Sequence, residues 1–285
     1  MCRFVAYLGK KPALLRHVLD APENSLIIQS RAARKGPSPI NADGFGIGWY
    51  QKDIGENPAI FKSILPAWND QNLLSIASKV ASNCFCGHVR ASTVGGVNFE
   101  NCHPFAFGQH MFVHNGSIFG MEKIRQKLGA ELRDPYYSHI LGRTDSEYFF
   151  ALIMDYLHRF PKETDPLDAM AQAMQQAIHR VNELQKPYGQ EDHARINTVL
   201  TNGSEMIVTR YTSGDPEKVL PIFFTFGDEW DAQSKTSIMQ PTQDKPNALL
   251  VATEPLTEKI SGWQKIPANH MLKVDKHLNY EIVSL

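Results

Sequence analysis

Cys2 is the residue whose position most directly suggests chemistry. An initiator Met that precedes a small residue is generally removed, which would leave Cys2 as the first residue, with both a thiol and a free α-amino group. The α-amino group has a reference pKa of about 7.7 to 8.0, so it can accept the thiol proton without a histidine partner. Cys2 is therefore a candidate N-terminal nucleophile, and the alternative is a buried cysteine in a first strand.

Arg90 and the Asn115-Gly116 pair are candidates for binding a substrate. Arg90 stands where a strand enters a glycine-containing loop, and its planar guanidinium suits a carboxylate, although a surface salt bridge is the alternative. Asn115-Gly116 predicts a tight hairpin turn, because both residues tolerate positive φ. In the functional interpretation, the Asn115 side-chain amide and the Gly116 N–H are paired donors for a tetrahedral oxyanion.

Residues 144–147 have the pattern of a capping box. Thr144 is the expected N-cap and Glu147 the expected third helical residue of a helix that runs to about Arg159. The capping box uses Thr144 and Glu147, so it assigns no hydrogen bond to the Asp145 side chain in the first helical turn. There the helix dipole stabilises a carboxylate, which can face a substrate ammonium.

A metal site is a rival interpretation of the cysteines and histidines. Cys84, Cys86 and His88 are spaced to share one face of a strand, and Cys102 and His103 follow as further candidates. The Cys-x-Cys spacing differs from the usual zinc knuckle. Small buried thiols in a core strand explain the same pattern, so we expect no metal and no cofactor.

The elements that must position these residues are strands, then helices, then strands. Strands are predicted at 2–8, 43–50, 84–91, 109–119, 197–200, 206–211, 221–226, 248–253, 271–274 and 280–283, and long helices at 146–159 and 166–184. Without a regular βαβ alternation, this order favours an α+β fold of antiparallel sheets with helices on their outer faces.

Composition limits the classes of partner. The 285 residues include 42% hydrophobic residues, enough for a large core. Lys plus Arg number 29 against 30 Asp plus Glu, so we expect no nucleic-acid partner. No apolar stretch suggests a membrane span or a signal peptide, so we expect no membrane partner and a cytoplasmic protein whose four cysteines are thiols.

Taken in order, the motifs resemble the class II glutamine amidotransferases, which are N-terminal nucleophile hydrolases, and in particular their stand-alone YafJ-type branch. The resemblance implies a single amidotransferase domain over residues 2–285, folded as a four-layer αββα sandwich. The segments that carry it are residues 2–9, 43–50, 87–93, 102–105, 114–116, 144–147 and 252–256.

The resemblance also implies an activity. Cys2 would attack the γ-carboxamide of glutamine or of a γ-glutamyl compound, and a γ-glutamyl thioester would form. The implied roles are as follows: Arg90 binds the α-carboxylate, Asp145 the α-ammonium, Asn115 with Gly116 the oxyanion, and Thr93 lines the glutamine pocket. The larger enzymes of the family have Trp after the arginine, whereas this chain has Ala91, so we expect a different pocket wall.

Three function classes follow. The first is the glutaminase part of an amidotransferase whose ammonia goes to water or to a partner protein, since the chain ends at Leu285 without a synthase domain. The second is a hydrolase of γ-glutamyl peptides or amides in a thiol-metabolite pathway of the ergothioneine or glutathione type. The third is a non-catalytic module that binds γ-glutamyl groups or a metal.

Overall fold

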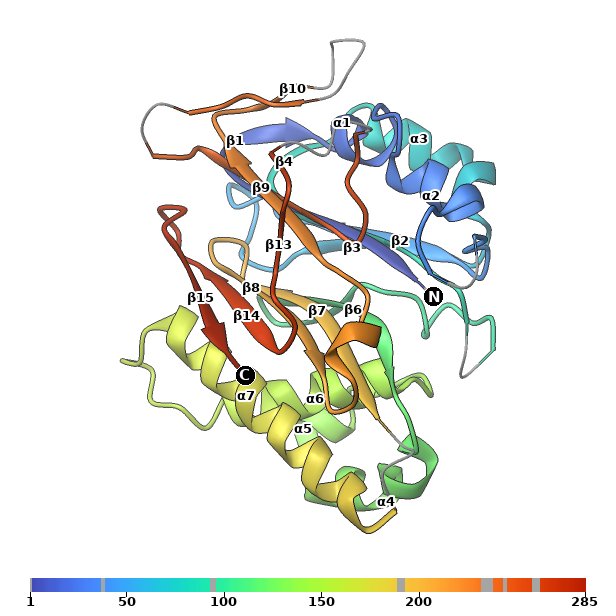
Figure 1. The fold of residues 1–285 in the computed structure, drawn as a ribbon, viewed down its shortest axis with the longest axis vertical. Coiled ribbons are helices and arrows are strands. Elements are labelled where there is room, and N and C mark those ends of the chain that lie inside the picture. The colour runs from blue at the N-terminus through green and yellow to red at the C-terminus, as the bar shows by residue number, and fades with distance from the viewer. Residues whose placement is uncertain are drawn as a thin grey trace.

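Two antiparallel sheets are stacked face to face, and helices cover the outer face of each (Figure 1). The layers therefore follow the order helix, sheet, sheet, helix, which confirms the predicted α+β sandwich. The computed structural model describes residues 2–36, 39–92, 96–188, 193–231, 238–242, 245–257 and 262–285.

The first sheet has the chain's first strand near its centre. Its order is β13-β9-β12-β1-β4-β2-β3. Side chains alternate along β1, so that Phe4, Ala6 and Leu8 face the other sheet while Val5 and Tyr7 face the helices. The strands are β1 (Arg3–Leu14), β2 (Phe45–Trp49), β3 (Ala59–Ser63), β4 (Ala81–Val89), β9 (Phe223–Gly227), β12 (Ala248–Ala252) and β13 (Gln264–Lys265).

The second sheet follows the order β15-β14-β8-β7-β6-β5. Its strands are β5 (Phe105–Phe107), β6 (His110–Ile118), β7 (Ala194–Thr201), β8 (Met206–Thr212), β14 (His270–Val274) and β15 (Tyr280–Ser284). A separate two-stranded ribbon pairs β10 (Trp230–Asp231) with β11 (Ile238–Met239).

The hairpin turn predicted at Asn115-Gly116 is wrong. Both residues lie inside the uninterrupted strand β6, where Asn115 pairs with Asn197 and Gly116 with Ile196. A Cβ at Gly116 would lie 1.9 Å from the carbonyl oxygen of Arg195. The glycine is therefore required by the close approach of β7, and pairing over the whole strand overrides the local turn preference.

The helices divide between the two outer faces. Those on the first sheet are α1 (Arg16–Leu19), α2 (Leu26–Ala32) and α3 (Gln71–Ala77), and those on the second are α4 (Met121–Glu131), α5 (Asp134–Tyr137), α6 (Asp145–Leu157) and α7 (Pro166–Gln185). The two long predicted helices correspond to α6 and α7. Among the described residues, no helix has the length and apolar character to cross a membrane.

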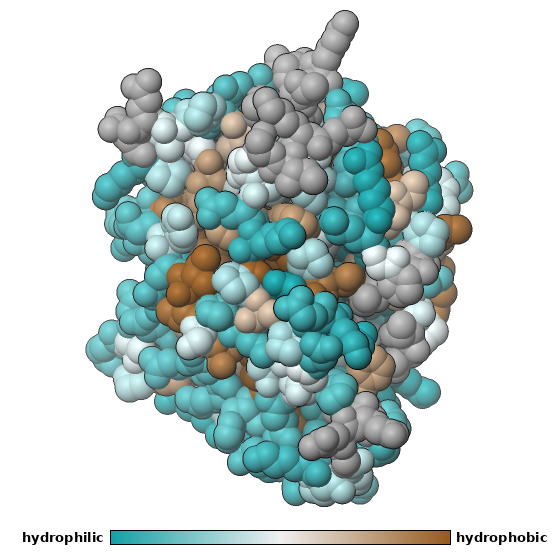
Figure 2. Space-filling model, in the orientation of Figure 1, coloured by the Kyte–Doolittle hydropathy of each residue, from teal (hydrophilic) through white to brown (hydrophobic). Residues whose placement is uncertain are grey.

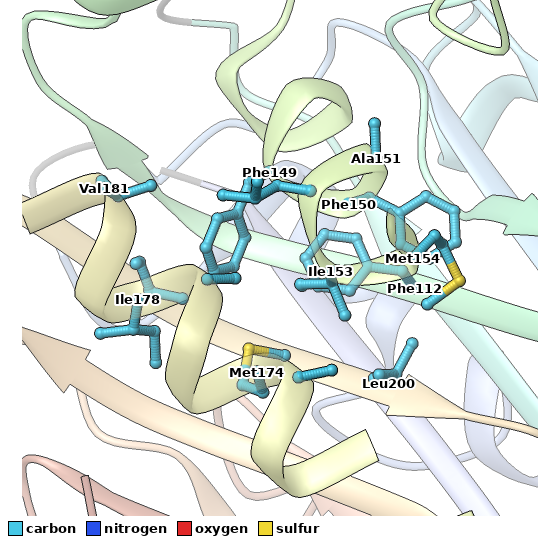
Figure 3. Packing of buried hydrophobic residues seen from close by; sticks show 14 of the residues in the cluster. Phe112, Phe149, Phe150, Ala151, Ile153, Met154, Met174, Ile178, Val181 and Leu200 are labelled. Carbon is cyan, nitrogen blue, oxygen red and sulfur yellow. The ribbon is translucent and has the colours of Figure 1, made fainter. Parts of the chain in front are cut away.

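Three hydrophobic clusters fill the three spaces between the four layers. One cluster lies between the second sheet and its helices. There Phe149 and Ile153 of α6 and Ile178 of α7 pack towards Phe112 and Leu200 of the sheet (Figure 3). One face of the molecule is mostly hydrophilic, with apolar surface gathered about midway, at the level where the sheets face each other (Figure 2). The cluster between the sheets extends to Phe4 and Val113, which are close in sequence to the candidate residues Cys2 and Asn115.

Candidate active site

Cys2 lies at the start of β1, directly opposite the end of β4. Arg3 pairs with Val89, so continuation of this register sets Cys2 opposite Arg90. The Cys2 Sγ lies 3.5 Å from the Ala91 nitrogen and 3.6 Å from the Ala91 oxygen. Cys2 is half-buried, whereas the other three cysteines are buried.

Burial raises the pKa of the Cys2 thiol, and the nearby Asp145 carboxylate raises it too, while the hydrogen bond with Ala91 and the charge of Arg90 lower it. The net direction is upward, so at neutral pH the sulfur is protonated. Nucleophilic attack by Cys2 therefore needs a base within reach of the sulfur. Removal of Met1 would give Cys2 an α-amino group that meets that requirement.

A buried ion pair holds the start of β1. The Arg3 Nε lies 2.7 Å from a carboxylate oxygen of Glu254, and both side chains are 1% exposed. Arg3 also donates to the Cys2 carbonyl at 2.8 Å, and Glu254 accepts from the backbone nitrogens of Arg34 and Lys35. The prediction from sequence assigned no role to Arg3 or Glu254. The one available signal was that both lie in segments that resemble the family.

Arg90 is almost completely buried beside Cys2 and begins the loop after β4. Its Nη1 donates to the Gly96 carbonyl at 2.6 Å. Asp43 fixes the backbone here, because its nitrogen donates to the Arg90 carbonyl at 3.0 Å and its carboxylate accepts from Ser92 at 2.7 Å. Thr93, predicted to line the substrate pocket, lies outside the described residues.

The side-chain amide of Asn115 is buried and has no hydrogen-bond partner among the described residues. This residue shares a strand face with Met111 and Val113, which fill the space between the sheets, so it faces the layer in which Cys2 also lies. It is 2% exposed, and neither its Nδ2 nor its Oδ1 has a hydrogen-bond partner among the described residues. A buried amide left unpaired costs about 1 to 3 kcal/mol, so this amide would gain from a ligand that pairs with it.

Asp145 lies in the first turn of α6, as predicted, but its carboxylate is not free. It accepts from the Ile118 nitrogen at 2.6 Å and from the Ser146 nitrogen at 2.8 Å. These bonds fix a negative charge close enough to raise the pKa of the Cys2 thiol. Because each carboxylate oxygen has two lone-pair sites, Asp145 can still accept from an ammonium.

Half of the predicted capping box is present. The Thr144 hydroxyl accepts from the Glu147 nitrogen at 3.2 Å, which confirms Thr144 as N-cap. The Glu147 carboxylate does not return to Thr144 but accepts from the backbone nitrogens of Leu141 and Gly142, at 2.8 and 2.7 Å. Glu147 thus organises the loop before α6, which is where Asp145 begins.

Buried histidines connect the two sheets behind Cys2. His88 of β4 lies 3.2 Å from the His114 carbonyl on β6, and His114 contacts the Ser146 hydroxyl on α6 at 2.8 Å. Burial lowers the pKa of His88 to about 3, and it lowers the pKa of His103, whose ring lies 4.3 Å from that of His88, well below its usual range. These rings are neutral at pH 7, and they fill the space between the layers that they connect.

The cysteines of β4 pack as core residues. Cys84 and Cys86 belong to the cluster between the sheets, and the Cys84 Sγ lies 3.4 Å from the Thr201 hydroxyl. Burial raises the pKa of the Cys84 thiol to about 12 and that of Cys86 well above its usual value. Over the part of the chain that is described, no three His, Cys, Asp or Glu side chains are grouped so as to hold a metal ion.

A thiol, a cation, an anion and an unpaired amide thus converge at one end of the space between the sheets. A fixed positive and a fixed negative charge suit the two charged ends of an α-amino acid. A thiol with an amide donor suits attack on a carbonyl and stabilisation of the oxyanion that forms. The arrangement is that of an amide-cleaving site for an amino-acid derivative.

Comparison with known proteins agrees with this chemistry. The family model for class II glutamine amidotransferases matches residues 14–279. The probable glutamine amidotransferase DUG3 of Saccharomyces cerevisiae is 34% identical over 97% of this chain and 82% of its own length. The gamma-glutamyl-hercynylcysteine sulfoxide hydrolase of Mycolicibacterium smegmatis is 28% identical over 98% of both chains.

Solved structures share the fold. A glutamine aminotransferase class-II domain protein from Silicibacter pomeroyi superposes with a TM-score of 0.66, at 24% identity and over 99% of both chains. The glutamine phosphoribosylpyrophosphate amidotransferase of B. subtilis superposes with a TM-score of 0.62 at 17% identity, over 99% of this chain and 49% of that one.

Proposed function

The chain belongs to the class II glutamine amidotransferase family, and from this premise we propose that residues 2–285 form one domain that cleaves a γ-glutamyl amide with Cys2 as its first residue and nucleophile. The observation that carries the proposal is the buried, unpaired amide of Asn115, which faces the same layer as Cys2. No cofactor is needed, because the thiol, its base and the oxyanion donors are all groups of the chain.

The proposed reaction has two stages. The α-amino group of Cys2 takes the thiol proton, and the thiolate attacks the γ-carbonyl of the substrate. The Asn115 amide and the Gly116 N–H stabilise the oxyanion. When the C–N bond breaks, the proton passes to the leaving nitrogen, so ammonia or an amine departs and a γ-glutamyl thioester remains. Water then attacks the thioester and releases glutamate.

Recognition in this proposal rests on opposite charges at fixed positions. Arg90 binds the α-carboxylate of the glutamyl group and Asp145 binds its α-ammonium, while Thr93 lines the pocket. The support for the two charged roles is that Arg90 and Asp145 are both buried and that the charge of each acts on the Cys2 thiol, Arg90 from the end of β4 and Asp145 from the start of α6. Two opposite charges around one thiol match a zwitterionic substrate.

The two candidate activities differ in the leaving group, which is ammonia in one and a larger amine in the other. The similarity to DUG3 supports a glutaminase that releases ammonia into solution or passes it to a partner protein. The similarity to the M. smegmatis hydrolase supports release of a larger amine from a γ-glutamyl peptide or thiol metabolite. Ala91 contacts Cys2, and the family's larger enzymes have Trp at this position, so the smaller side chain supports a larger leaving group. We place either activity in the cytoplasm.

The test is glutamate release by the purified protein. Intact mass should show loss of Met1, and glutamine, γ-glutamyl dipeptides and γ-glutamyl anilide should then be compared at equal concentration. A form with one residue retained before Cys2 should be folded by circular dichroism and inactive. If no γ-glutamyl compound yields glutamate, or if the form with the extra residue turns over normally, the proposal is wrong.

A further inference from the structure

Asn197 of β7 has a buried side-chain amide, and the protein bonds only one end of it. The Nδ2 donates to the Leu220 carbonyl at 2.9 Å, whereas the Oδ1 has no hydrogen-bond partner among the described residues. The residue is 2% exposed. Because a backbone carbonyl can only accept, the bond to Leu220 fixes which end of the amide is the donor and which is the acceptor. Asn197 therefore holds an unused acceptor in a fixed orientation.

Asn197 is the cross-strand neighbour of Asn115. The two residues pair between β6 and β7, and Val113 and Val199, two positions away on each strand, both belong to the cluster between the sheets. Asn197 therefore faces the same layer as Asn115, with the two Cβ atoms about 5 Å apart. The two amides do not bond to each other, since in the described part of the chain both polar atoms of Asn115 are unpaired too. An unused donor and an unused acceptor thus lie side by side.

The bond to Leu220 also brings Asn197 close to the start of β1. Leu220 precedes β9 of the first sheet, so the Asn197 amide reaches from the second sheet to the first. A Cβ on Gly36 would lie 3.5 Å from both the Leu220 Cδ1 and the Arg3 Nη2. Leu220 therefore lies close to Arg3, the residue after Cys2. This contact puts Asn197 in the wall of the proposed active site.

We propose that Asn197 is a specificity residue whose Oδ1 accepts a hydrogen bond from the leaving nitrogen of the scissile amide. The inference rests on the proposed function and adds a group that recognises the bond to be cleaved. The oxygen and the nitrogen of that amide are attached to one carbon, so a donor for the oxygen has to lie beside an acceptor for the nitrogen. Asn115 and Asn197 supply such a pair from adjacent strands.

The consequence is selectivity for amides over esters. A primary or secondary amide keeps an N–H for Asn197 before attack and as the amine departs, whereas the leaving oxygen of an ester carries no hydrogen. A site built to bond a substrate N–H discriminates against an analogue that lacks it, because its own buried polar group then stays unpaired. The Asn197 carboxamide takes up no proton in this role, so the base remains the α-amino group of Cys2.

Two substrates of the same shape test the proposal, γ-glutamyl methylamide and glutamate γ-methyl ester. Both give the same γ-glutamyl thioester on Cys2, so a difference in kcat/KM between them arises before that intermediate. Asn197→Leu should lower kcat/KM for the amide by roughly 10- to 100-fold, since the bond to the leaving nitrogen is lost. It should leave kcat/KM for the ester unchanged. A purely structural asparagine would affect the two substrates alike.

Asn24→Leu is the matched control. Asn24 is 1% exposed, its Nδ2 donates to the Pro255 carbonyl at 2.7 Å, and its Oδ1 is likewise unpaired over the described residues. It lies just before α2, which covers the outer face of the first sheet, and not in the layer between the sheets. The variant should lower the melting temperature and keep wild-type kcat/KM for both substrates.

The outcomes separate this inference from the proposed function. Equal losses on amide and ester in folded Asn197→Leu, or no loss on the amide, would overturn the role of Asn197 and leave Cys2 in place. If the wild-type protein cleaves neither substrate, the proposed function itself is wrong. Circular dichroism establishes that each variant is folded, and Asn197→Ala gives the same comparison of amide with ester if the leucine variant does not fold.

Discussion

The space between the two sheets is filled differently at its centre and at its end. At the centre, Cys84 and Cys86 pack among aliphatic side chains, and burial raises the pKa of both thiols far enough to keep them protonated. At the end, Cys2 is half-buried and Asn115 leaves a whole amide unpaired. Cysteines in the same space between the sheets thus serve stability at its centre, whereas the end of that space keeps groups that can bind a ligand.

The difference lies in whether polar groups are satisfied by the protein itself. Asn24 and Arg210 are buried or partly buried elsewhere, and each gives its donors to backbone carbonyls. Asn115 has none of these partners. A polar group that the fold leaves unsatisfied, such as the Asn115 amide, is free to bind a substrate, and the predictions below compare each proposed site residue with a residue of the same type elsewhere.

The largest effect is expected for Cys2 against Cys86. Cys2→Ala should reduce kcat by about 10⁴ or more, because the attacking atom is lost. Cys86→Ala should leave kcat unchanged and lower the free energy of unfolding by roughly 1 to 2 kcal/mol, since it only opens a small cavity. Steady-state kinetics and urea denaturation measure the two quantities. Equal activity of Cys2→Ala and wild type would remove Cys2 from the mechanism.

Arg90 should give the next largest effect. Arg90→Ala should lower kcat/KM by about 2 to 5 kcal/mol of transition-state binding, roughly 30- to 5000-fold, because it leaves the substrate carboxylate unpaired. Arg210→Ala should lower the melting temperature instead, since, over the described part of the chain, that guanidinium donates only to the carbonyls of Val219, Leu220 and Ile266. A folded Arg90→Ala protein with wild-type kcat/KM would contradict the assignment.

Asn115 is expected to affect rate without affecting stability. Asn115→Ala should reduce kcat by about 10² to 10³, as for loss of one oxyanion donor. Its melting temperature should not fall, because the amide has no bond to lose. In Asn24→Ala the reverse is expected, with normal kcat and a loss of about 1 kcal/mol, since Asn24 donates to the Pro255 carbonyl. A stability loss in Asn115→Ala with unchanged kcat would point to a purely structural asparagine.

His88, at the boundary between the two regions, should affect stability and not catalysis, and only below neutral pH. Its pKa falls from 6.5 to about 3 on burial, so between these values the unfolded chain binds a proton that the folded chain does not. Its contribution to stability is complete above about pH 6.5 and decreases as the pH falls towards 3, by up to about 1.4 kcal/mol per pH unit.

His88→Gln removes this titration. Urea denaturation at several pH values from 7 to 4.5 should therefore show a shallower loss of stability for His88→Gln than for wild type. Parallel stability curves for the two proteins would show that His88 is not buried as a neutral ring.

Local pattern predicted most strands and the two longest helices, but it missed α4 and the edge strands β3 and β5. The helical period and the proline at its start gave α7 to within a residue, and alternation gave β8 to within a residue but only the first half of β1. The edge strands β3 and β5 have three to five residues and gain their pairing from distant segments, so no local signal marked them. At Asn115-Gly116 the turn signal was strong and wrong, because strand β7 runs alongside it.

The candidate site was predictable in its residue types but not in its connections. A thiol at position 2, an arginine at a strand end and a carboxylate in a first helical turn can each be found from spacing. That Cys2 stands opposite Arg90 depends on a register between strands some 80 residues apart, as the Leu8–Cys84 pair shows. The Arg3–Glu254 pair joins positions that are 251 residues apart, and no local pattern relates them.

The central position of β1 has a consequence for biosynthesis. This strand leaves the ribosome first, yet it lies between β4 and β12, and Arg3 meets its counter-ion only when Glu254 has been made. Until β4 has been made the beginning of the chain has no neighbouring strand, and until β12 arrives it can pair on one side only, so it remains accessible to an aminopeptidase. After release, docking of β12 encloses it. Under the proposed mechanism, removal of Met1 thus belongs to the nascent chain, and the enzyme becomes competent only as its last strands arrive.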